Sequence, residues 1–186
     1  SFKTMNLPNA ILKTITKKGY KQPTPIQRKC LPLLMEGTDV VGMARTGSGK
    51  TLAFLIPLLC RLKSHSTKFG ARGLILVPTR ELAIQTAQVL RDLAKYLDLR
   101  VSLLVGGDSI EDQFTSLLAN PDIIVGTPGR ILHLAQEAST FSLRAVEYLV
   151  FDEADRLFEL GLLEQIKEII GMLPKSRQSC LFSATL

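Results

Sequence analysis

Two acidic residues, Asp152 and Glu153, directly follow an apolar run that extends from Val146 to Phe151. Such a run is typical of a strand covered by helices on both faces, and parallel sheets of this kind bind ligands at the carboxyl edge of their strands. A carboxylate there can hold Mg²⁺, while its neighbour orients or deprotonates a nucleophile. Acidic residues also favour the first turn of a helix, so the quartet from Asp152 to Asp155 could be a simple helix start.

A second candidate site is a glycine-rich segment between an apolar stretch, 39–43, and a helical pattern, 52–62. Strand, glycine-rich turn and helix are the context that a phosphate-binding loop requires. Its glycines let backbone N–H groups converge on a phosphate, and the positive end of the following helix adds to them. The lysine would reach the β- and γ-phosphates and the threonine would bind Mg²⁺. The segment consists of Ala44, Arg45, Thr46, Gly47, Ser48, Gly49, Lys50 and Thr51.

Apolar periodicity alternates along the chain between strand and helix patterns. Continuous apolar runs such as GLILV and DIIV indicate strands that are buried on both faces. With right-handed crossovers they predict an α/β fold in one domain, a three-layer α/β/α sandwich with a mainly parallel central sheet. We expect strands at 39–43, 72–77, 101–105, 122–126, 146–151 and 178–182, and helices at 8–18, 24–35, 50–63, 80–97, 109–118, 129–136 and 162–172.

In such a sandwich every junction from strand to helix faces the same edge. Three junctions offer hydroxyls, N–H groups at a helix start or an arginine, which are the groups that hold a sugar-phosphate backbone without reading its sequence. Each of them alone could be a helix cap or a turn. Three beside one phosphate loop favour a track for nucleic acid. They contain Pro78, Thr79 and Arg80, then Gly106 and Gly107, and then Thr127, Pro128, Gly129 and Arg130.

Composition indicates one compact domain of a reducing compartment. The 186 residues contain no apolar run of 18, so no membrane span is expected. Three cysteines, Cys30, Cys60 and Cys180, are too few and too scattered for a disulfide framework or a zinc site, and we expect them in the core. His65 and His133 have no plausible metal partners and are expected at the surface or in loops. The sequence does not begin with Met, and we expect it to be part of a longer protein.

Charge is unevenly distributed along the chain. The formal net charge is +6, yet residues 1–63 hold eleven Lys or Arg against two Asp or Glu, and the remainder holds twelve against fifteen. This asymmetry favours a polyanionic ligand, which could be a nucleotide, a nucleic acid or both.

Taken in order, these motifs resemble the first RecA-like domain of a DEAD-box RNA helicase over essentially the whole chain. The segment from Gly19 to Gln27 is similar to the family's adenine-recognising Q motif, and Phe2 stands where that motif has its upstream aromatic. Ala at the first position of the phosphate loop, Ala44, is usual in this family. The other motifs, from the phosphate loop through the RNA-contacting motifs to the acidic box and the motif that couples hydrolysis to strand separation, correspond to 44–51, 78–82, 106–107, 127–130, 152–155 and 183–185.

The resemblance implies a binding site for the base of ATP. Gln27 would pair with the adenine edge and reject guanine, because its amide has both a donor and an acceptor. Phe2 and Tyr20 would stack on the base, and the backbone near Gln22 would meet its amino group. Phe2 and Tyr20 could equally be core residues.

The resemblance also implies roles around the triphosphate. Lys50 would stabilise charge on the transferred phosphoryl group, and Thr51 and Asp152 would hold Mg²⁺. Glu153 would position and activate the attacking water. A further acidic residue, Asp155, would bond Ser183 or Thr185 and do no chemistry, although those two could be ordinary hydroxyls at a strand end.

The implied protein is an ATP-dependent RNA helicase that couples ATP hydrolysis to remodelling of RNA duplexes or RNA–protein complexes. Residues 1–29 would form the Q-motif region and 30–186 the phosphate-loop and DEAD core. Expected partners are RNA, through sequence-independent backbone contacts, and a second RecA-like domain that lies outside this sequence. Without that domain's arginine fingers the chain should bind adenine nucleotide but hydrolyse it poorly. Two alternatives stay open: an ATP-gated RNA clamp or scaffold that does not unwind, and another P-loop ATPase such as a DNA helicase or a transporter subunit.

Three stretches, 65–72, 106–114 and 146–161, are similar to a nucleolar helicase of large ribosomal subunit assembly. That similarity implies the nucleus, and within it the nucleolus, as the location, with the cytoplasm as the alternative. It also implies ribosome biogenesis as the process and pre-ribosomal particles as partners.

Overall fold

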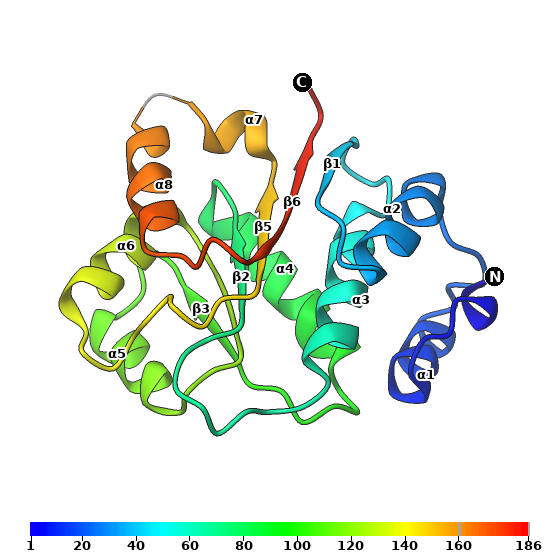
Figure 1. Cartoon of the computed structure of the whole chain (residues 1–186), viewed down its shortest axis with the longest axis horizontal. Helices are drawn as coiled ribbons and strands as arrows, with labels where there is room; N and C mark the ends of the chain where they lie inside the picture. The colour runs from blue at the N-terminus through cyan, green and yellow to red at the C-terminus, as the bar shows by residue number, and fades with distance from the viewer. Residues whose placement is uncertain (160, 186) are drawn as a thin grey trace.

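A six-stranded sheet forms the middle layer of the protein, in the order β1-β6-β5-β2-β4-β3 (Figure 1). The computed structural model describes residues 1–159 and 161–185. All five strand pairings are parallel, so the predicted mainly parallel sheet is confirmed and is wholly parallel among the described residues. The strands are β1 (Val40–Met43), β2 (Gly73–Leu76), β3 (Val101–Leu104), β4 (Ile123–Gly126), β5 (Tyr148–Asp152) and β6 (Gln178–Ser183).

Helices cover both faces of the sheet. In Figure 1, α5, α6 and α8 lie on one side and α1, α2 and α3 on the other. Apolar side chains of α4 join the core of the α1–α3 side, and those of α7 join the opposite core. The helices are α1 (Asn9–Lys17), α2 (Pro25–Met35), α3 (Lys50–Leu62), α4 (Arg80–Leu93), α5 (Ile110–Leu118), α6 (Pro128–Glu137), α7 (Ala154–Leu157) and α8 (Leu162–Gly171).

Successive side chains of the central strands enter opposite cores. Leu74 and Leu76 belong to the core under α5–α8, while Ile75 and Val77 belong to the core under α1–α4. All four are fully buried. Because both faces of the strand are covered, the apolar run has no polar positions, which explains the sequence pattern.

Two short helical segments differ from the expected elements. Residues Phe2–Thr4 form a 3₁₀ turn and α7 forms one turn after the acidic pair; both are too short to show helical periodicity. The expected helix 80–97 ends earlier, at Leu93. Beyond it the chain tightens, because Lys95 N–H donates to Asp92 O at 3.3 Å and Leu97 N–H to Ala94 O at 2.8 Å, the i→i−3 pattern of a helix end.

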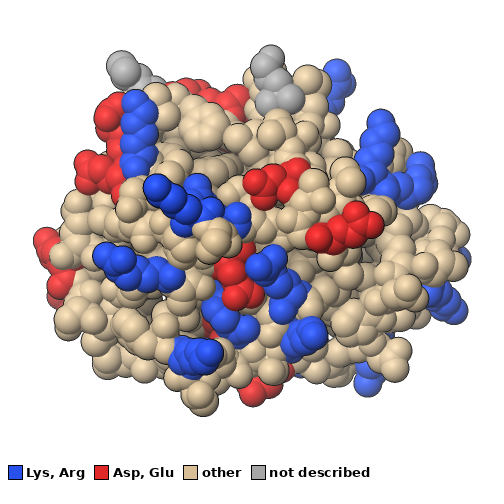
Figure 2. Space-filling model, in the orientation of Figure 1, with Lys and Arg blue, Asp and Glu red and all other residues tan. Residues whose placement is uncertain are grey.

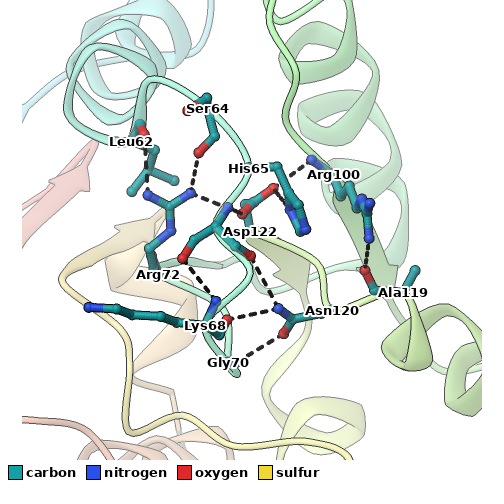
Figure 3. A network of polar contacts seen from close by, with 11 residues as sticks. Leu62, Ser64, His65, Lys68, Gly70, Arg72, Arg100, Ala119, Asn120 and Asp122 are labelled. Carbon is teal, nitrogen blue, oxygen red and sulfur yellow. Dashed lines mark hydrogen bonds and ion pairs between the residues drawn. The ribbon is translucent and has the colours of Figure 1, made fainter.

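The amino edge of the sheet is closed by a polar network around Asp122, the residue before β4 (Figure 3). Its carboxylate is 2% exposed and lies 2.8 Å from His65 Nδ1 and 2.9 Å from Arg72 Nη2. It also accepts from the backbone N–H groups of Ser66 at 3.1 Å and Arg100 at 2.9 Å. Thus His65 lies in a loop, as expected, but only 11% of its side chain is exposed because it binds a buried carboxylate.

Asn120 fixes the loop between α3 and β2 from a second side (Figure 3). Its amide group donates to Ser66 O at 3.3 Å and Lys68 O at 2.8 Å, and it accepts from Gly70 N–H at 2.9 Å. The loop 63–72 is therefore held at an edge remote from the strand-to-helix junctions.

Cys30 and Cys180 are buried and Cys60 is half-buried, and all three are free thiols. Among the described residues no helix has both the length and the apolar character to cross a bilayer.

Candidate nucleotide and nucleic-acid sites

Lys50 and Asp152 meet at the carboxyl edge of the sheet. Lys50 begins α3 after the loop from β1, and Asp152 ends β5. Their Nζ and Oδ1 atoms are 2.9 Å apart, with 8% and 0% of the side chains exposed. Lys50 Nζ is also 4.0 Å from Glu153 Oε1. Segments about a hundred positions apart in the sequence thus form one site.

The loop before α3 has the backbone of an anion site. Gly47 and Gly49 have φ of +82° and +88°, which glycine adopts without the steric cost that other residues meet. A Cβ at Gly49 would lie 2.6 Å from Gln27 Nε2, so the second position also needs glycine for space. No side chain caps the N-terminus of α3 among the described residues. Its N–H groups and Lys50 can therefore converge on phosphate oxygens.

A cleft of about 420 Å³ opens beside this loop. Its size is within the range of small-molecule sites. It connects the segment around Gln27, the phosphate loop, Glu153 and one face of α4. It is lined by Lys18, Tyr20, Gln22, Thr24, Gln27, Thr46, Gly47, Gly49, Lys50, Thr51, Leu52, Leu82, Gln85, Val89 and Glu153.

Gln27 already has partners for both ends of its amide. Its Oε1 accepts from Thr24 N–H at 2.9 Å, which with the Thr24 hydroxyl forms a capping box at the start of α2. Its Nε2 donates to Gly49 O at 3.0 Å. The side chain lines the cleft but is 2% exposed. Gln27 therefore couples the Q-motif segment to the phosphate loop, a role that its amide chemistry alone did not predict.

The two aromatic candidates occupy different environments. Tyr20 is 47% exposed and lines the cleft. Phe2 is 3% exposed and packs in the core under α1–α4. It lines a separate hollow of about 360 Å³ that shares Tyr20 with the cleft. Of the two readings of Phe2, core packing describes the conformation seen here, and stacking of Tyr20 on a base stays a prediction.

The oxygen donors around Asp152 fit a magnesium ion. Asp152 Oδ2 is buried and has no hydrogen-bond partner among the described residues, and Thr51 stands half-buried at the cleft. Burial raises the pKa of Asp152 although Lys50 opposes the shift, so the carboxylate gains from a nearby cation. The described residues hold no cluster of three or more His, Cys, Asp or Glu that could enclose a metal. The donors match instead the usual mode of Mg²⁺, with few carboxylates, phosphate oxygens and water.

Glu153 is held in a backbone conformation that is uncommon for its type. Its φ of +51° and ψ of 52° lie in the left-handed region. Its N–H donates to Asp152 Oδ1 at 2.9 Å, and Arg156 Nη1 donates to its Oε2 at 3.1 Å. The carboxylate consequently lines the cleft beside Lys50. The sequence interpretation missed Arg156, although its i+3 spacing from Glu153 on a short helix could have indicated it.

Asp155 contacts two hydroxyl residues at the end of β6, the last residue of the strand, Ser183, and Thr185 beyond it. Its N–H donates to Ser183 Oγ at 3.3 Å, and Thr185 Oγ1 donates to its Oδ2 at 3.2 Å. Ser183 O in turn accepts from Ala44 N–H at 2.9 Å. A short chain of contacts therefore links α7, the end of β6 and the first residue of the phosphate loop.

The three junctions of the expected nucleic-acid track are adjacent. Arg80 Nη1 donates to Gly106 O at 3.0 Å and lies 2.6 Å from Asp108 Oδ1. Arg130 Nη1 donates to Asp108 O at 3.2 Å, so one loop binds both arginines. Asp108 neutralises part of this surface and was not anticipated from the sequence.

The two threonines of this track differ in their capping contacts. Thr79 caps α4, because its Oγ1 accepts from Leu82 N–H at 3.2 Å. Thr127, by contrast, makes no side-chain cap bond among the described residues, so its hydroxyl can turn towards a ligand. Capping therefore explains Thr79 but not Thr127.

The other residues of the track lie at the same edge. Pro78 and Gly129 are half-buried and Pro128 is buried. A Cβ at Gly107 would lie 3.4 Å from Arg80 Nη1.

Several residues that line the cleft belong to no motif and were not expected from the sequence. Leu82, Gln85 and Val89 line the cleft from α4, at the i+3 and i+4 spacing of one helical face. Lys18 lines the cleft as well. Helical periodicity predicts that the three α4 residues share a face, but not which ligand that face meets.

Residues 24–186 match the family model for DEAD/DEAH box helicases. The chain is 60% identical to the ATP-dependent RNA helicase DBP10 of Yarrowia lipolytica and to its namesake in Emericella nidulans, over 186 and 185 residues. It spans 20% of the length of each relative. A solved DEAD box protein from the hyperthermophile Methanococcus jannaschii superposes with a TM-score of 0.90 at 40% identity, over 97% of this chain and 49% of that one.

Proposed function

Because this chain belongs to the DEAD/DEAH box helicase family, we propose that it is the ATP-binding domain of an ATP-dependent RNA helicase. The observation that carries the proposal is the 2.9 Å contact between Asp152 and Lys50, which lines a cleft about 420 Å³ in volume. A phosphate loop and an acidic box act together by binding a triphosphate and its cation between them.

Binding of ATP would be divided among three segments of the chain. The N–H groups of 46–51 and the Lys50 ammonium hold the phosphates. Thr51 and Asp152 would hold Mg²⁺, which would neutralise charge on the phosphate oxygens. The base would lie towards Tyr20 and Gln22, at the outer part of the cleft near Gln27.

Hydrolysis transfers the γ-phosphoryl group to water, and the bond to the β-phosphate oxygen breaks. Glu153 orients the water and accepts its proton, since its carboxylate lines the cleft beside Lys50. Lys50 stabilises the negative charge that develops on the leaving phosphate. Asp155, Ser183 and Thr185 lie outside the reacting atoms and would transmit the state of the site to the rest of the enzyme.

RNA would bind along the junctions after β2, β3 and β4. Arg80, Arg130 and Thr127 offer donors at one edge, which suits phosphate and sugar contacts that are independent of sequence. A second RecA-like domain would complete both sites, and without its arginines the chain should turn ATP over slowly. The parent protein would then remodel RNA duplexes or RNA–protein complexes.

The similarity to DBP10 proteins and the three stretches at 65–72, 106–114 and 146–161 support a place in ribosome biogenesis, with pre-ribosomal particles as partners. The nucleolus is then the expected location. A tagged full-length protein that is excluded from the nucleolus would count against this assignment.

Nucleotide binding by the chain tests the proposal directly. We expect ATP and ADP to bind in the presence of Mg²⁺ and GTP to bind much more weakly. Equal affinity for ATP and GTP, or no binding by a folded chain, contradicts it. The rival function is an ATP-gated RNA clamp that uses the same residues without strand separation, and a duplex-unwinding assay on the two-domain parent distinguishes the two.

A further inference from the structure

Lysines from α1 and from the turn that follows α4 converge on one tyrosine, at the end of α4 that lies away from Arg80. The ammonium groups of Lys13, Lys17 and Lys95 lie 4.2, 5.1 and 5.7 Å from the centre of the Tyr96 ring. Lys17 Nζ also donates to Tyr96 Oη at 2.5 Å. We call these residues, together with Lys18, the lysine cluster. Over the face drawn in Figure 2, basic and acidic side chains are interspersed. A local excess of lysines therefore distinguishes the cluster from such a mixed surface.

The cluster keeps a positive charge after its local partners are counted. Lys18 pairs with Asp92 at 2.9 Å, which leaves three cations on Tyr96. Cations are favoured at helix C-termini, and the ends of α1 and α4 together supply about one negative charge, so about two positive charges remain. The Lys17 hydrogen bond lowers the pKa of the Tyr96 phenol, as expected in a positive field.

A hollow of about 200 Å³ lies within the cluster. It is smaller than a site for a whole drug-sized ligand, so it suits a single charged group of a longer ligand. Lys18 lines both this hollow and the nucleotide cleft. Along α4, Gln85 and Val89 line the cleft and Asp92 lines the hollow, at the spacing of one helical face. The hollow is thus the outer continuation of that face.

The cluster is too far from the junction track to serve the same phosphate. Arg80 begins α4 and Leu93 ends it, which separates the two ends by about 20 Å. A ligand that engages both must be long. The charged groups of such a ligand must be negative. Each would be bound by single contacts to ammonium groups, because lysine acts as a point charge and does not form the bidentate contacts of arginine.

We propose that the lysine cluster is a second binding site for the phosphate backbone of single-stranded RNA, apart from the junction track. The proposal depends on the proposed function in that the chain must bind RNA. A basic groove with an aromatic side chain is the arrangement that holds single strands without reading sequence. RNA bound here would replace the repulsion among three ammonium groups with contacts to phosphate.

Salt dependence of RNA binding measures the contacts at this site. A uridine homopolymer long enough to cover both sites is titrated with the chain at several salt concentrations. Each phosphate contact on a single strand contributes about −0.7 to the slope of log affinity against log salt. The variant Lys13→Gln/Lys17→Gln/Lys95→Gln should therefore lower the magnitude of the slope by at least about 0.7, for one phosphate in the hollow, and by up to about 2 if each lysine meets a phosphate of its own. A matched control, Lys29→Gln/Lys68→Gln/Lys175→Gln, removes equal charge from exposed positions elsewhere and should change the slope by less than half as much.

Further arms of the experiment separate the possible failures. An Arg80→Gln variant weakens binding at the junction track. If it weakens RNA binding while the triple variant behaves like its control, the cluster proposal is wrong and the proposed function stands. If the unmodified chain binds no RNA, the cluster proposal and the RNA-binding part of the proposed function are both overturned, while nucleotide binding tests the ATP-binding part separately. If the triple variant loses binding of a polyglutamate peptide but keeps its RNA slope, the cluster binds an acidic protein segment and the RNA proposal is overturned.

Tyr96 gives a readout that does not depend on affinity. Bound phosphate should raise the pKa of its phenol, which ultraviolet absorbance follows in a chain without tryptophan. Tyr148 is fully buried, so Tyr20 is the main background and a Tyr20→Phe variant removes it. A phenol titration that is unchanged by saturating RNA contradicts the proposal.

Discussion

Gln27 Nε2 donates to the carbonyl oxygen of Gly49 at 3.0 Å, so the side chain expected to read adenine also anchors the phosphate loop. The same amide accepts from Thr24 N–H at the start of α2. Recognition of the base and the shape of the phosphate site are therefore properties of one side chain. An adenine base that forms hydrogen bonds with the Gln27 amide would therefore also change the contact of this amide with the phosphate loop.

A Gln27→Glu substitution tests that double role. The carboxylate keeps the contact to Thr24 N–H but faces Gly49 O without a proton to donate. We expect a loss of about 1–3 kcal/mol in the free energy of unfolding, measured by urea denaturation, and weaker binding of ATP. Affinity for ATP should fall more than affinity for GTP. An equal fall for both nucleotides would show that Gln27 anchors the loop without reading the base.

A Lys50→Met substitution removes the ammonium group but keeps much of the apolar stem. Hydrogen bonds to charged groups contribute about 1.5–3 kcal/mol, so affinity for ATP should fall by about 10- to 150-fold. Titration with a fluorescent nucleotide measures the change. Lys29→Met, at an exposed position, serves as the control and should bind normally. An unchanged affinity in a folded Lys50→Met chain would remove the basis of the nucleotide assignment.

A Glu153→Gln substitution in the full-length parent tests the assignment of the base. The amide keeps the shape of the side chain but cannot accept the proton of water. RNA-stimulated hydrolysis should fall by about 10² to 10⁴, while affinity for ATP should stay within a few-fold. Glu36→Gln, at an exposed helix end, should leave both unchanged. Normal turnover in the Glu153→Gln protein would assign the base to another residue.

Asp122→Asn should weaken the fold in a pH-dependent manner. Burial raises the pKa of Asp122, but the Arg100 N–H, His65, Arg72 and the Ser66 N–H outweigh it, so the net shift is downward. A carboxyl with a lowered pKa stabilises the fold above its ordinary value of 3.8, and this contribution is lost as the pH falls through the lowered value. At pH 7 the substitution should cost about 2 kcal/mol.

Denaturation of the two proteins across pH checks this expectation. The difference in stability between the native chain and Asp122→Asn should be constant near neutrality and should shrink below pH 3.8, the ordinary value of the carboxyl. Nucleotide affinity should be unaffected, because Asp122 lies at the opposite edge of the sheet. A difference that grows on acidification would contradict the downward shift.

Gly126→Ala should destabilise the sheet where it leads into the junction at Thr127. An added Cβ would lie 2.2 Å from Leu104 O in the neighbouring strand. Neither atom can move away easily, because the backbones of Gly126 and Leu104 are paired in the sheet. Overpacking of this kind costs about 1–3 kcal/mol. Gly171→Ala is the matched control, because its Cβ would meet no atom within 4 Å and its φ is not positive. Equal stability of the two variants would contradict the close approach of the strands.

Features that depend on local order were predicted best from the sequence. The continuous apolar runs correctly indicated strands buried on both faces, and the glycines and Lys50 correctly located a strand–turn–helix unit. Helix α7 was anticipated only as a possible helix start at the acidic quartet 152–155, since four residues make a single turn and show no repeating pattern. Nor could the contact of His65 with Asp122, because it joins loops 57 positions apart.

Within the site, motif residues were identified by type, but their partners were not. Arg156 beside Glu153 and Asp108 beside Arg80 are ordinary surface charges in the sequence, and only the fold gives them a function. For Phe2 the resemblance to the Q motif implied a contact with the base, and core packing was the equal alternative. Its 3% exposure in this structure reflects the apolar core that α1 and α2 build around it.

The strand order has a consequence for biosynthesis. Among the described residues strand β1, which leads into the phosphate loop, pairs with β6 alone, and the register joins Val40 to Cys180. During translation the first strand must wait for about 140 further residues before it has a neighbour, and such non-local pairing is slow to form. A nascent chain arrested before β6 should therefore fail to retain immobilised ATP. Retention of a nascent chain on immobilised ATP would then indicate that its synthesis has passed β6.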